Sequence, residues 1–493
     1  MTRPADHPYH TRSQRHAEAL QALEAVDQAH VLDRYDALDD ASKDALLREI
    51  EGVDWPEVGR LIESHVRQKP EFTMPTNLEP APWYPHTPTP ELESTYRKAR
   101  QLGESRLRQG KVAAFCVAGG QGSRLGWDHP KGTFPATPIR KAPLFQVFAE
   151  YLRKAQHKYH SVIPLYVMTS PLNHDATVAF FEKHDHFGLD PDHVMCFPQA
   201  MMPAIDMQTH KVLMAAPDAM ALSPNGHGGS LKALWTSGAL ADMKDRGVEQ
   251  ISYVQVDNPS VHVVDPLFIG LHAKDDAQMS SKMLPKREPM EKLGNFCVVE
   301  GKVRVIEYSN LPEELAHQRT DDGELRFRAG SIAIHVIRVD FVESLNNRPE
   351  GFSLPWNRAE KKVAFVDEAG NFIEPKAPNA VKLETFVFDA LPLCENSIVV
   401  ETDRVEEFAP IKNADTPEGQ PPAADSPQSS KLLQSERAAR WLESIGVSVP
   451  RTPAGDLDAV LEIAPLAAIE PEDLKPHDLP TSIDAGATWL LEG

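Results

Sequence analysis

Residues 111–135 read KVAAFCVAGGQGSRLGWDHPKGTFP, and this stretch decides the fold of the chain. It opens with a short apolar run at residues 112–117, which is long enough for a buried strand and too short to span a membrane. Four glycines follow within eight residues, beginning with Gly119 and Gly120. Backbone N–H groups in such a loop can approach a bound anion without interference from Cβ atoms. The stretch therefore predicts a strand followed by an anion-binding loop.

Two familiar glycine motifs do not fit this loop. The dinucleotide fingerprint requires G-x-G-x-x-G, whereas Gly120, Gly122 and Gly126 read G-x-G-x-x-x-G. The P-loop requires a lysine directly after a glycine, whereas Lys131 follows a proline. The loop still carries positive charge, because Arg124 lies within it and Lys131 just beyond it. The glycines alone are equally consistent with a simple tight turn.

From residue 111 onward, short apolar runs alternate with helical stretches, which predicts an α/β fold with a mostly parallel sheet. Ligands of such sheets bind beyond the carboxyl ends of the strands. Four polar features follow predicted strands: the glycine loop, Thr169 with Ser170, Gln199, and Asp257. We expect them to meet at one edge of the sheet.

Other elements are predicted from local patterns. Apolar spacing indicates helices between residues 12 and 66, and then a proline-rich connector up to residue 90. A hairpin is expected at residues 296–299 and 303–306, and single helices at residues 229–246 and 381–390. The domain hypothesis is a helical N-terminal region with its connector (1–105), a catalytic domain (106–405), and a linker with a small C-terminal domain (406–493).

The composition of the chain argues against several classes of function. The formal net charge of −21 argues against non-specific binding to nucleic acids or anionic membranes. No apolar run is long enough to cross a membrane, and the first ten residues lack the apolar core of a signal peptide. The four cysteines lie far apart in apolar contexts, as expected for thiols in a reducing cytoplasm. They are Cys116, Cys196, Cys297 and Cys394.

The glycine loop and the residues after it follow the pattern GGxGxRLG-x3-PKG, which resembles the signature of the UDP-sugar pyrophosphorylases, most closely their N-acetylhexosamine branch. Further segments resemble this family in order and spacing over about residues 95–415. These segments are PQAMMPAID (198–206), SPNGHGG (223–229), VQVDNP (254–259), VIEYS (305–309) and FAPIKNAD (408–415). A weaker resemblance is present in LEIAPL (461–466), near the end of the chain.

The resemblance implies a GT-A-like, Rossmann-like mixed sheet and a uridylyltransferase that joins UTP to a hexose 1-phosphate, giving a UDP-sugar and pyrophosphate. It assigns catalysis to three cationic residues: Arg124, Lys131 and Lys412. It assigns the nucleotide to Gly119, Gly120, Gln199, Gly226 and Asp257. It assigns the sugar to His227, Gly294, Glu307 and Ser331. Asp257 would also hold Mg²⁺, which is typically shared between a carboxylate and substrate phosphates.

Several alternatives stay open. Asp257 could cap the next segment, Lys412 could be a solvated lysine, and His227 could be an ordinary surface histidine. A glycosyltransferase that consumes a UDP-sugar usually needs a D-x-D step, and VQVDNP supplies only Asp257. A catalytically silent sensor of UDP-sugars is a further alternative, although retention of Arg124 and Lys131 argues against it.

The residues at the sugar positions depart from the pattern of the N-acetylhexosamine branch. Enzymes of the N-acetylhexosamine branch typically carry AGNIANH where this chain has AGSIAIH at residues 329–335, and asparagine where it has His227. Ser331 is shorter than asparagine, and Ile334 cannot donate a hydrogen bond. We expect N-acetylglucosamine 1-phosphate as the substrate, with glucose 1-phosphate or broad specificity as the alternative.

Overall fold

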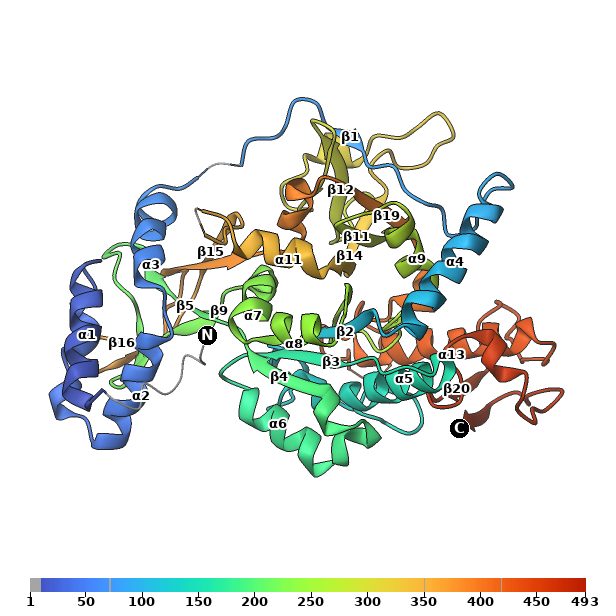
Figure 1. Cartoon of the computed structure of the whole chain (residues 1–493), viewed down its shortest axis with the longest axis horizontal. Coiled ribbons are helices and arrows are strands. Elements are labelled where there is room, and N and C mark those ends of the chain that lie inside the picture. The colour runs from blue at the N-terminus through green and yellow to red at the C-terminus, as the bar shows by residue number, and fades with distance from the viewer. Residues whose placement is uncertain (1–9, 71, 350, 418) are drawn as a thin grey trace. The chain divides into compact units, whose positions relative to one another are not determined.

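The computed structural model describes residues 10–70, 72–349, 351–417 and 419–493. These residues form two compact units, each described by itself (Figure 1). Of the described residues, the helical unit contains those between 10 and 74 together with residues 198–237 and 352–390. The sheet unit contains residues 75–197, 238–351 and 391–493. None of the helices within the described residues is both long and apolar enough to cross a bilayer.

The sheet unit is built on a sheet with ten strands among the described residues. Its main path runs in the order β1 (Glu79–Pro80), β12 (Gly294–Val299), β14 (Ala329–Arg338), β10 (Gln250–Gln255), β2 (Val112–Val117), β3 (Leu165–Thr169) and β4 (Val194–Pro198). Three strands pair beside this path: β11 (Met279–Pro285) with β14, β13 (Lys302–Ile306) with β12, and β19 (Ser397–Glu401) with β11.

The centre of this sheet is parallel and buried on both faces. β10 and β2 pair in parallel along their whole length, and β3 pairs in parallel with β2. β14 runs antiparallel to β10. Phe115 of β2 and Tyr253 of β10 have no exposed surface. Parallel strands of this kind need helices on both faces, and the predicted mixed, mostly parallel α/β fold is confirmed.

Helices cover both faces of the sheet. α4 (Glu93–Arg108), α5 (Leu144–Tyr159) and α9 (Pro266–Lys274) share one hydrophobic core with strand residues such as Val167. Side chains alternate between the two faces of a strand, so Tyr166 points the opposite way. Its hydroxyl donates to Asp242 of α8 (Ala239–Asp245) at 2.5 Å, which places α8 on the second face. The remaining helices of this part are α6 (His174–Lys183), α10 (Glu313–Ala316), α11 (Val339–Asn346) and α12 (Arg404–Glu407).

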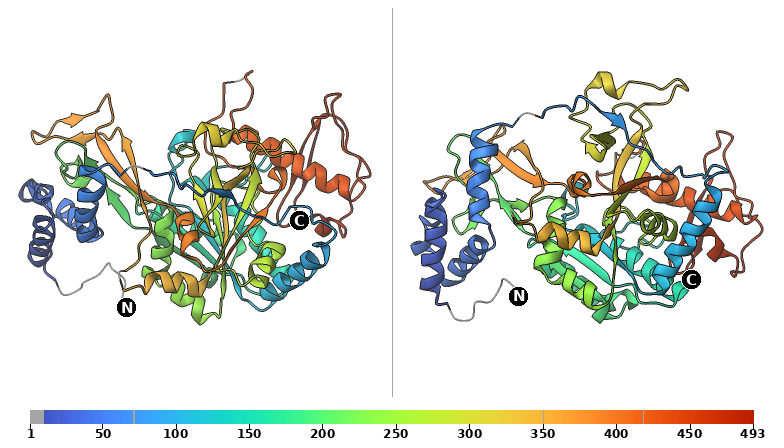
Figure 2. Two further views of the ribbon diagram at one scale, coloured as in Figure 1. Left: turned by 90° about the horizontal axis from the view of Figure 1, so that it is seen from above. Right: turned by 45° about the horizontal axis from the view of Figure 1, so that its top comes forward.

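The C-terminal segment, red in Figures 1 and 2, consists of α13 (Pro427–Ser444) and the parallel strands β20 (Ala459–Ile463) and β21 (Ala487–Leu491). Trp441, Leu442 and Leu461 are central to its small core. Arg140, in the sheet unit, donates to Glu462 of β20 at 2.8 Å and to Glu150 of α5 at 2.9 Å. These nearly buried ion pairs fix the segment within the unit.

The helical unit confirms the helices expected between residues 12 and 66. They are α1 (Arg12–Glu24), α2 (Asp40–Glu51), α3 (Trp55–Leu61) and a π-helical turn (Ile62–Arg67). Their apolar faces, including Leu46, share one hydrophobic core with Val381 and Leu383 of β18 (Ala380–Thr385). The strands of this unit are β5 (Met201–Pro203), β6 (Ile205–Asp206), β7 (Met214–Ala216), β8 (Ala219–Met220), β9 (Leu222–Pro224), β15 (Trp356–Lys361), β16 (Phe365–Val366), β17 (Phe372–Ile373) and β18 (Ala380–Thr385).

Two predicted helices are wrong. Residues 381–390 form β18 and then a 3₁₀ turn (Val387–Leu393), because Val381, Leu383 and Thr385 alternate inward between β15 and β6. Residues 229–246 form two helices, α7 (Ser230–Thr236) and α8, because Gly238 adopts a left-handed φ of +84° between them. The expected hairpin is confirmed as β12 and β13, with left-handed residues at its turn.

Two glycines allow α4 and α9 to pack backbone against backbone. A Cβ atom added at Gly103 would lie 1.8 Å from the carbonyl oxygen of Pro266, and one at Gly270 would lie 1.7 Å from that of Ala99. Neither neighbour is a flexible side chain that could move aside. The packing of these helices therefore depends on both glycines.

We predict that Gly103→Ala lowers the free energy of unfolding by about 1–3 kcal/mol, because the added methyl group overpacks the contact. Helix propensity alone would act in the opposite direction, since alanine is favoured over glycine by about 1 kcal/mol. Chemical denaturation measures the difference, with Gln101→Ala on the exposed surface of α4 as the control. A Gly103→Ala protein as stable as the parent would refute the packing argument.

Candidate active site

The glycine loop folds back on itself beyond β2. Lys131 N donates to Gly120 O at 3.2 Å, and Gly122 N donates to His129 O at 3.1 Å. These bonds close residues 120–131 into a compact turn. Gly119 is buried, while Gly120 and Arg124 are exposed, and Arg124 forms no ion pair with any described residue. The loop therefore offers backbone N–H groups and a free guanidinium at the end of a strand.

Asn173 fixes this loop, although the sequence analysis did not identify it. It precedes α6, is 1% exposed, and donates through Nδ2 to Ala118 O at 3.0 Å and Gly120 O at 3.2 Å. Its Oδ1 accepts from Ser170 N at 2.8 Å. One side chain thus joins the end of β3 to the glycine loop. An asparagine just before a helix is common as a cap, so the sequence held no specific signal for this role.

Asp257 and Lys131 lie together. Asp257 follows β10, and the carboxylate Oδ2 is 3.8 Å from Lys131 Nζ. Both side chains are mostly buried, with 13% and 16% of their surface exposed. Val256 N donates to Val117 O at 3.1 Å, which extends the β2–β10 pairing up to the site. The predicted convergence of the glycine loop, the end of β3 and Asp257 is present within the sheet unit.

The segment that carries Lys412 is held against Asp257 through its backbone. Ile411 N donates to Asp257 O at 2.8 Å. Asn258 Nδ2 donates to Glu407 O at 2.7 Å, and Asn258 Oδ1 accepts from Ala409 N at 3.0 Å. The Lys412 ammonium itself lies 3.7 Å from Asp425. The structure thus brings the backbone of Lys412 to the site, while its side chain is paired elsewhere.

A buried ion cluster of Lys282, Asp265 and Glu407 holds this segment at Glu407. Lys282, 3% exposed, donates to Asp265 at 2.7 Å and to Glu407 at 2.5 Å. Burial alone would raise the pKa of Asp265, but the charge of Lys282 and the hydrogen bonds from Lys282 and Phe268 N together lower that pKa below its usual value. Asp265 and Lys282 are therefore charged at neutral pH, and Lys282 holds Glu407 in place.

The three residues assigned to the sugar in this unit lie together. Gly294 of β12 is the register partner of Ser331 of β14. A Cβ atom at Gly294 would lie 3.4 Å from Glu307 Oε1. Burial raises the pKa of Glu307. Beyond Ser331, β14 contains a bulge at which Ala333 has φ +56°, and Ile334 is 3% exposed within the hydrophobic core.

The other three predicted residues belong to the helical unit. Gln199 is 6% exposed. Gly226 has φ +84°, and a Cβ atom there would lie 2.3 Å from Thr385 O. His227 Nδ1 accepts from Val387 N at 3.1 Å, so its proton resides on Nε2. Burial lowers the pKa of His227 to about 4, which keeps the ring neutral.

The positive charges and the hydrogen-bond donors of this site suit a bound polyphosphate. Arg124 and Lys131 are cationic, and the loop supplies backbone N–H groups, which together favour an anion. Within the described residues no three histidine, cysteine or carboxylate groups gather as a metal site. Asp257 therefore stands as a single carboxylate beside the anion-binding loop. One carboxylate fits Mg²⁺ that is shared with substrate phosphates and waters, rather than a metal caged by protein.

Comparison with known proteins agrees with this geometry. Residues 82–418 match the family described as UTP–glucose-1-phosphate uridylyltransferase. The chain is 36% identical over 399 residues to UDP-N-acetylhexosamine pyrophosphorylase-like protein 1 of Homo sapiens, covering 77% of each chain. It is 35% identical over 357 residues to UDP-N-acetylglucosamine pyrophosphorylase of Saccharomyces cerevisiae, covering 71% of this chain and 73% of the relative.

A solved structure shares the fold. The uridine diphosphate N-acetylglucosamine pyrophosphorylase of Trypanosoma brucei aligns with a TM-score of 0.82 and 24% identity, covering 99% of each chain. The chain is therefore a nucleotidyltransferase, as the sequence predicted. It belongs to the UTP–glucose-1-phosphate uridylyltransferase family, which confirms the resemblance to UDP-sugar pyrophosphorylases.

We predict that Asn173→Asp loosens the glycine loop, because it keeps the acceptor for Ser170 and removes both donors to Ala118 and Gly120. Hydrogen exchange of peptides covering residues 118–126 should become roughly tenfold faster or more, as expected when buried carbonyls lose their partner. Asp175→Ala, on the exposed side of the same helix, is the control. Unchanged exchange in Asn173→Asp would show that the loop is held by other contacts.

Proposed function

We propose that this protein transfers the uridylyl group of UTP to N-acetylglucosamine 1-phosphate, releasing pyrophosphate. The observation that carries the proposal is the placement of Lys131 and Asp257 together beside the glycine loop, at the ends of β2 and β10. The names of the relatives in human and yeast support an N-acetylhexosamine as the sugar.

The reaction needs no covalent intermediate on the protein. A phosphate oxygen of the sugar 1-phosphate attacks the α-phosphorus of UTP, a new P–O bond forms, and the bond to the β-phosphate oxygen breaks as pyrophosphate leaves. Both reactants are anions, so catalysis consists mainly of alignment and charge neutralisation. Lys131 and Arg124 hold the triphosphate in this scheme. Lys412 joins them by leaving Asp425, a change of side-chain rotamer on a segment already anchored at Asp257.

Asp257 is the proposed ligand of Mg²⁺. When bound, the metal ion supplies positive charge to the phosphate oxygens and lowers the cost of bringing two anions together. Gly119, Gly120, Gln199 and Gly226 are proposed to bind the nucleotide. Gly294, Glu307, Ser331 and His227 are proposed to bind the sugar.

A panel of sugar 1-phosphates, each incubated with UTP and Mg²⁺ and followed by pyrophosphate release, tests the proposed function. We expect the highest kcat/KM for N-acetylglucosamine 1-phosphate. A higher value for glucose 1-phosphate would instead favour the second candidate, a glucose-type or broad-specificity enzyme, to which Ser331 and Ile334 lend support. Absence of pyrophosphate with every sugar would refute both and favour a sensor of UDP-sugars.

The metal assignment makes a separate prediction. Activity should vanish with a chelator and return with added Mg²⁺. Asp257→Asn should need a much higher Mg²⁺ concentration, because a neutral amide is a weaker ligand than a carboxylate. Asp265→Asn is unsuitable as a control because it breaks the Lys282 ion cluster. Asp175→Asn is the control instead, because Asp175 is exposed on α6 and belongs neither to the proposed metal site nor to that cluster. A parent-like Mg²⁺ titration of Asp257→Asn would make Asp257 a structural residue.

The choice of sugar makes another prediction. Ser331→Asn together with His227→Asn should raise the ratio of kcat/KM for N-acetylglucosamine 1-phosphate over glucose 1-phosphate by about tenfold, because each amide can bond an acetamido group that a glucose lacks. Ser331→Asn alone separates the two positions, since His227 also accepts from Val387 N. A flat ratio, or one that moves toward glucose, would show that these positions do not read the 2-substituent.

A further inference from the structure

The helix α13 carries a stripe of polar side chains that bind segments outside the C-terminal part of the chain. Its members are spaced four, three and four residues apart, which places them on one face of the helix. They are Ser430, Gln434, Arg437 and Trp441. A neighbouring face packs into the small C-terminal core through Ala438 and Leu442. That core alone does not require the polar stripe.

Arg437 joins two segments that meet at Asp257. Its Nη1 donates to Ser260 O at 2.8 Å and to Glu406 O at 3.2 Å. Ser260 lies three residues after Asp257, and Glu406 belongs to the segment that is held against it. The guanidinium lies 5.1 Å from the centre of the Trp441 ring, and Trp441 Nε1 donates to the Glu406 carboxylate at 2.8 Å. The guanidinium is therefore held in place while it bridges the two backbones.

The other half of the stripe binds two further carbonyl groups. Ser430 Oγ donates to Ala409 O at 2.6 Å, in the segment that carries Lys412. Gln434 Nε2 donates to Ala136 O at 3.0 Å, in the turn that follows the PKG step of the glycine-loop motif. Ala136 and Ala409 have no exposed surface. Loss of either donor would leave a buried carbonyl without its side-chain partner, which is costly.

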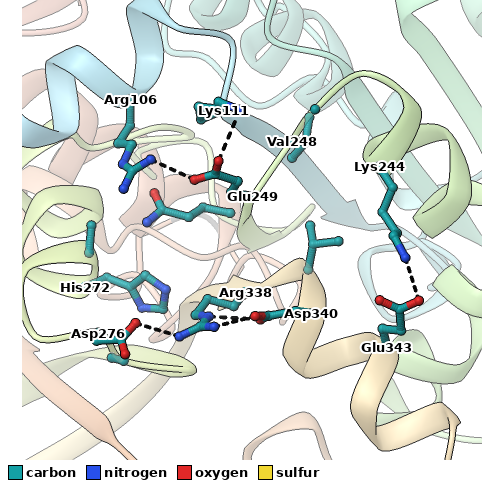
Figure 3. A pocket seen from close by; sticks show the side chains of 15 residues that line it. Arg106, Lys111, Lys244, Val248, Glu249, His272, Asp276, Arg338, Asp340 and Glu343 are labelled. Carbon is teal, nitrogen blue, oxygen red and sulfur yellow. Dashed lines mark hydrogen bonds and ion pairs between the residues drawn. The ribbon is translucent and has the colours of Figure 1, made fainter.

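The opposite edge of the sheet is joined in another way. There, Arg106 and Lys111 form ion pairs with Glu249 (Figure 3). Lys111 and Glu249 directly precede β2 and β10, so charged side chains tie the starts of these strands together. Carboxylates placed in this way at the carboxyl edge would compete with phosphates for Arg124 and Lys131. The bonds of α13 to carbonyl groups hold the loops there without occupying those two cations.

We propose that the polar stripe of α13 positions Lys131, Asp257 and Lys412 relative to one another for the transfer reaction. Its side chains bind the segments that carry these three residues, so they are positioning residues rather than catalytic ones. This role presupposes the proposed function of the site. A displacement of about 1 Å in a reacting group can cost about 100-fold in rate, so the exact placement of these segments matters.

Variants of the stripe, measured on the full chain, test this role. Arg437→Met and Gln434→Leu remove its hydrogen bonds with side chains of similar length, and Arg437→Lys keeps a charged donor. Leu442→Ala is the matched control, because it destabilises the C-terminal core and leaves the stripe unchanged.

Three measurements are made on each variant, well below the lowest Tm of the set. Pyrophosphate release from UTP and N-acetylglucosamine 1-phosphate gives kcat, KM and the Mg²⁺ concentration for half-maximal rate. Hydrogen exchange of peptides covering residues 134–142 and 257–262 reports on the two segments without any turnover. Thermal unfolding gives the loss of stability.

We expect Arg437→Met to lower kcat and to raise the Mg²⁺ requirement, each by about tenfold, because the segment after Asp257 is loosened. Exchange should become faster at residues 257–262, and Arg437→Lys should restore part of each change. Gln434→Leu should lower kcat with a parent-like Mg²⁺ requirement and should speed exchange only at residues 134–142. Leu442→Ala should lose at least as much stability and keep the kcat, the Mg²⁺ requirement and both exchange rates of the parent.

A parent-like kcat in both Arg437→Met and Gln434→Leu would overturn the proposal, and so would an equal loss of kcat in Leu442→Ala. If Arg437→Met does not fold, Gln434→Leu decides by the same measurements. A parent that releases no pyrophosphate with any sugar 1-phosphate would overturn the proposed function, and this role with it. Parent-like variants of an active enzyme would overturn this role alone.

Discussion

The parallel pairing of β2 with β10 is the constraint on which the candidate active site depends. Val117 and Gln255 are register partners at the ends of these strands, and Val256 N still donates to Val117 O at 3.1 Å. The glycine loop and Asp257 therefore leave the sheet side by side, although more than a hundred residues separate them in the chain. A slip of this register would turn the side chains of one strand to the other face and would separate Lys131 from Asp257.

Around this pairing, the chain stiffens its loops with asparagine side chains. Asn173 ties the glycine loop to the end of β3, and Asn258 ties the 407–411 segment to the end of β10. An amide both donates and accepts without adding charge. That matters in a protein with a net charge of −21 whose proposed substrates are themselves anions. Positive charge at the loop itself comes from Arg124 and Lys131.

The sequence predicted the parts of this arrangement that depend on local pattern. The glycine loop, the strand before Asp257 and the β12–β13 hairpin each carry their own signal in consecutive residues. The helix predicted at residues 381–390 is wrong although Val381, Leu383 and Thr385 alternate with polar residues as they do in a strand. The run is short, and its pairing with β15 and β6 decides the structure. Asn173, and the pairing of Lys412 with Asp425, could not be predicted, because each depends on contacts between distant segments. Where the domain boundaries lie stays a prediction.

The central claim is that Lys131 and Asp257 act together on the same triphosphate. A double-mutant cycle of Lys131→Ala and Asp257→Ala, measured as kcat/KM for UTP at fixed Mg²⁺ and sugar 1-phosphate, tests it most directly. If Lys131 acts directly and Asp257 acts through bound Mg²⁺ on the same phosphates, the second substitution should cost much less once the first is present, with a coupling energy of about 1–3 kcal/mol. Additive losses, with a coupling energy near zero, would show that the two residues act independently and would contradict the account.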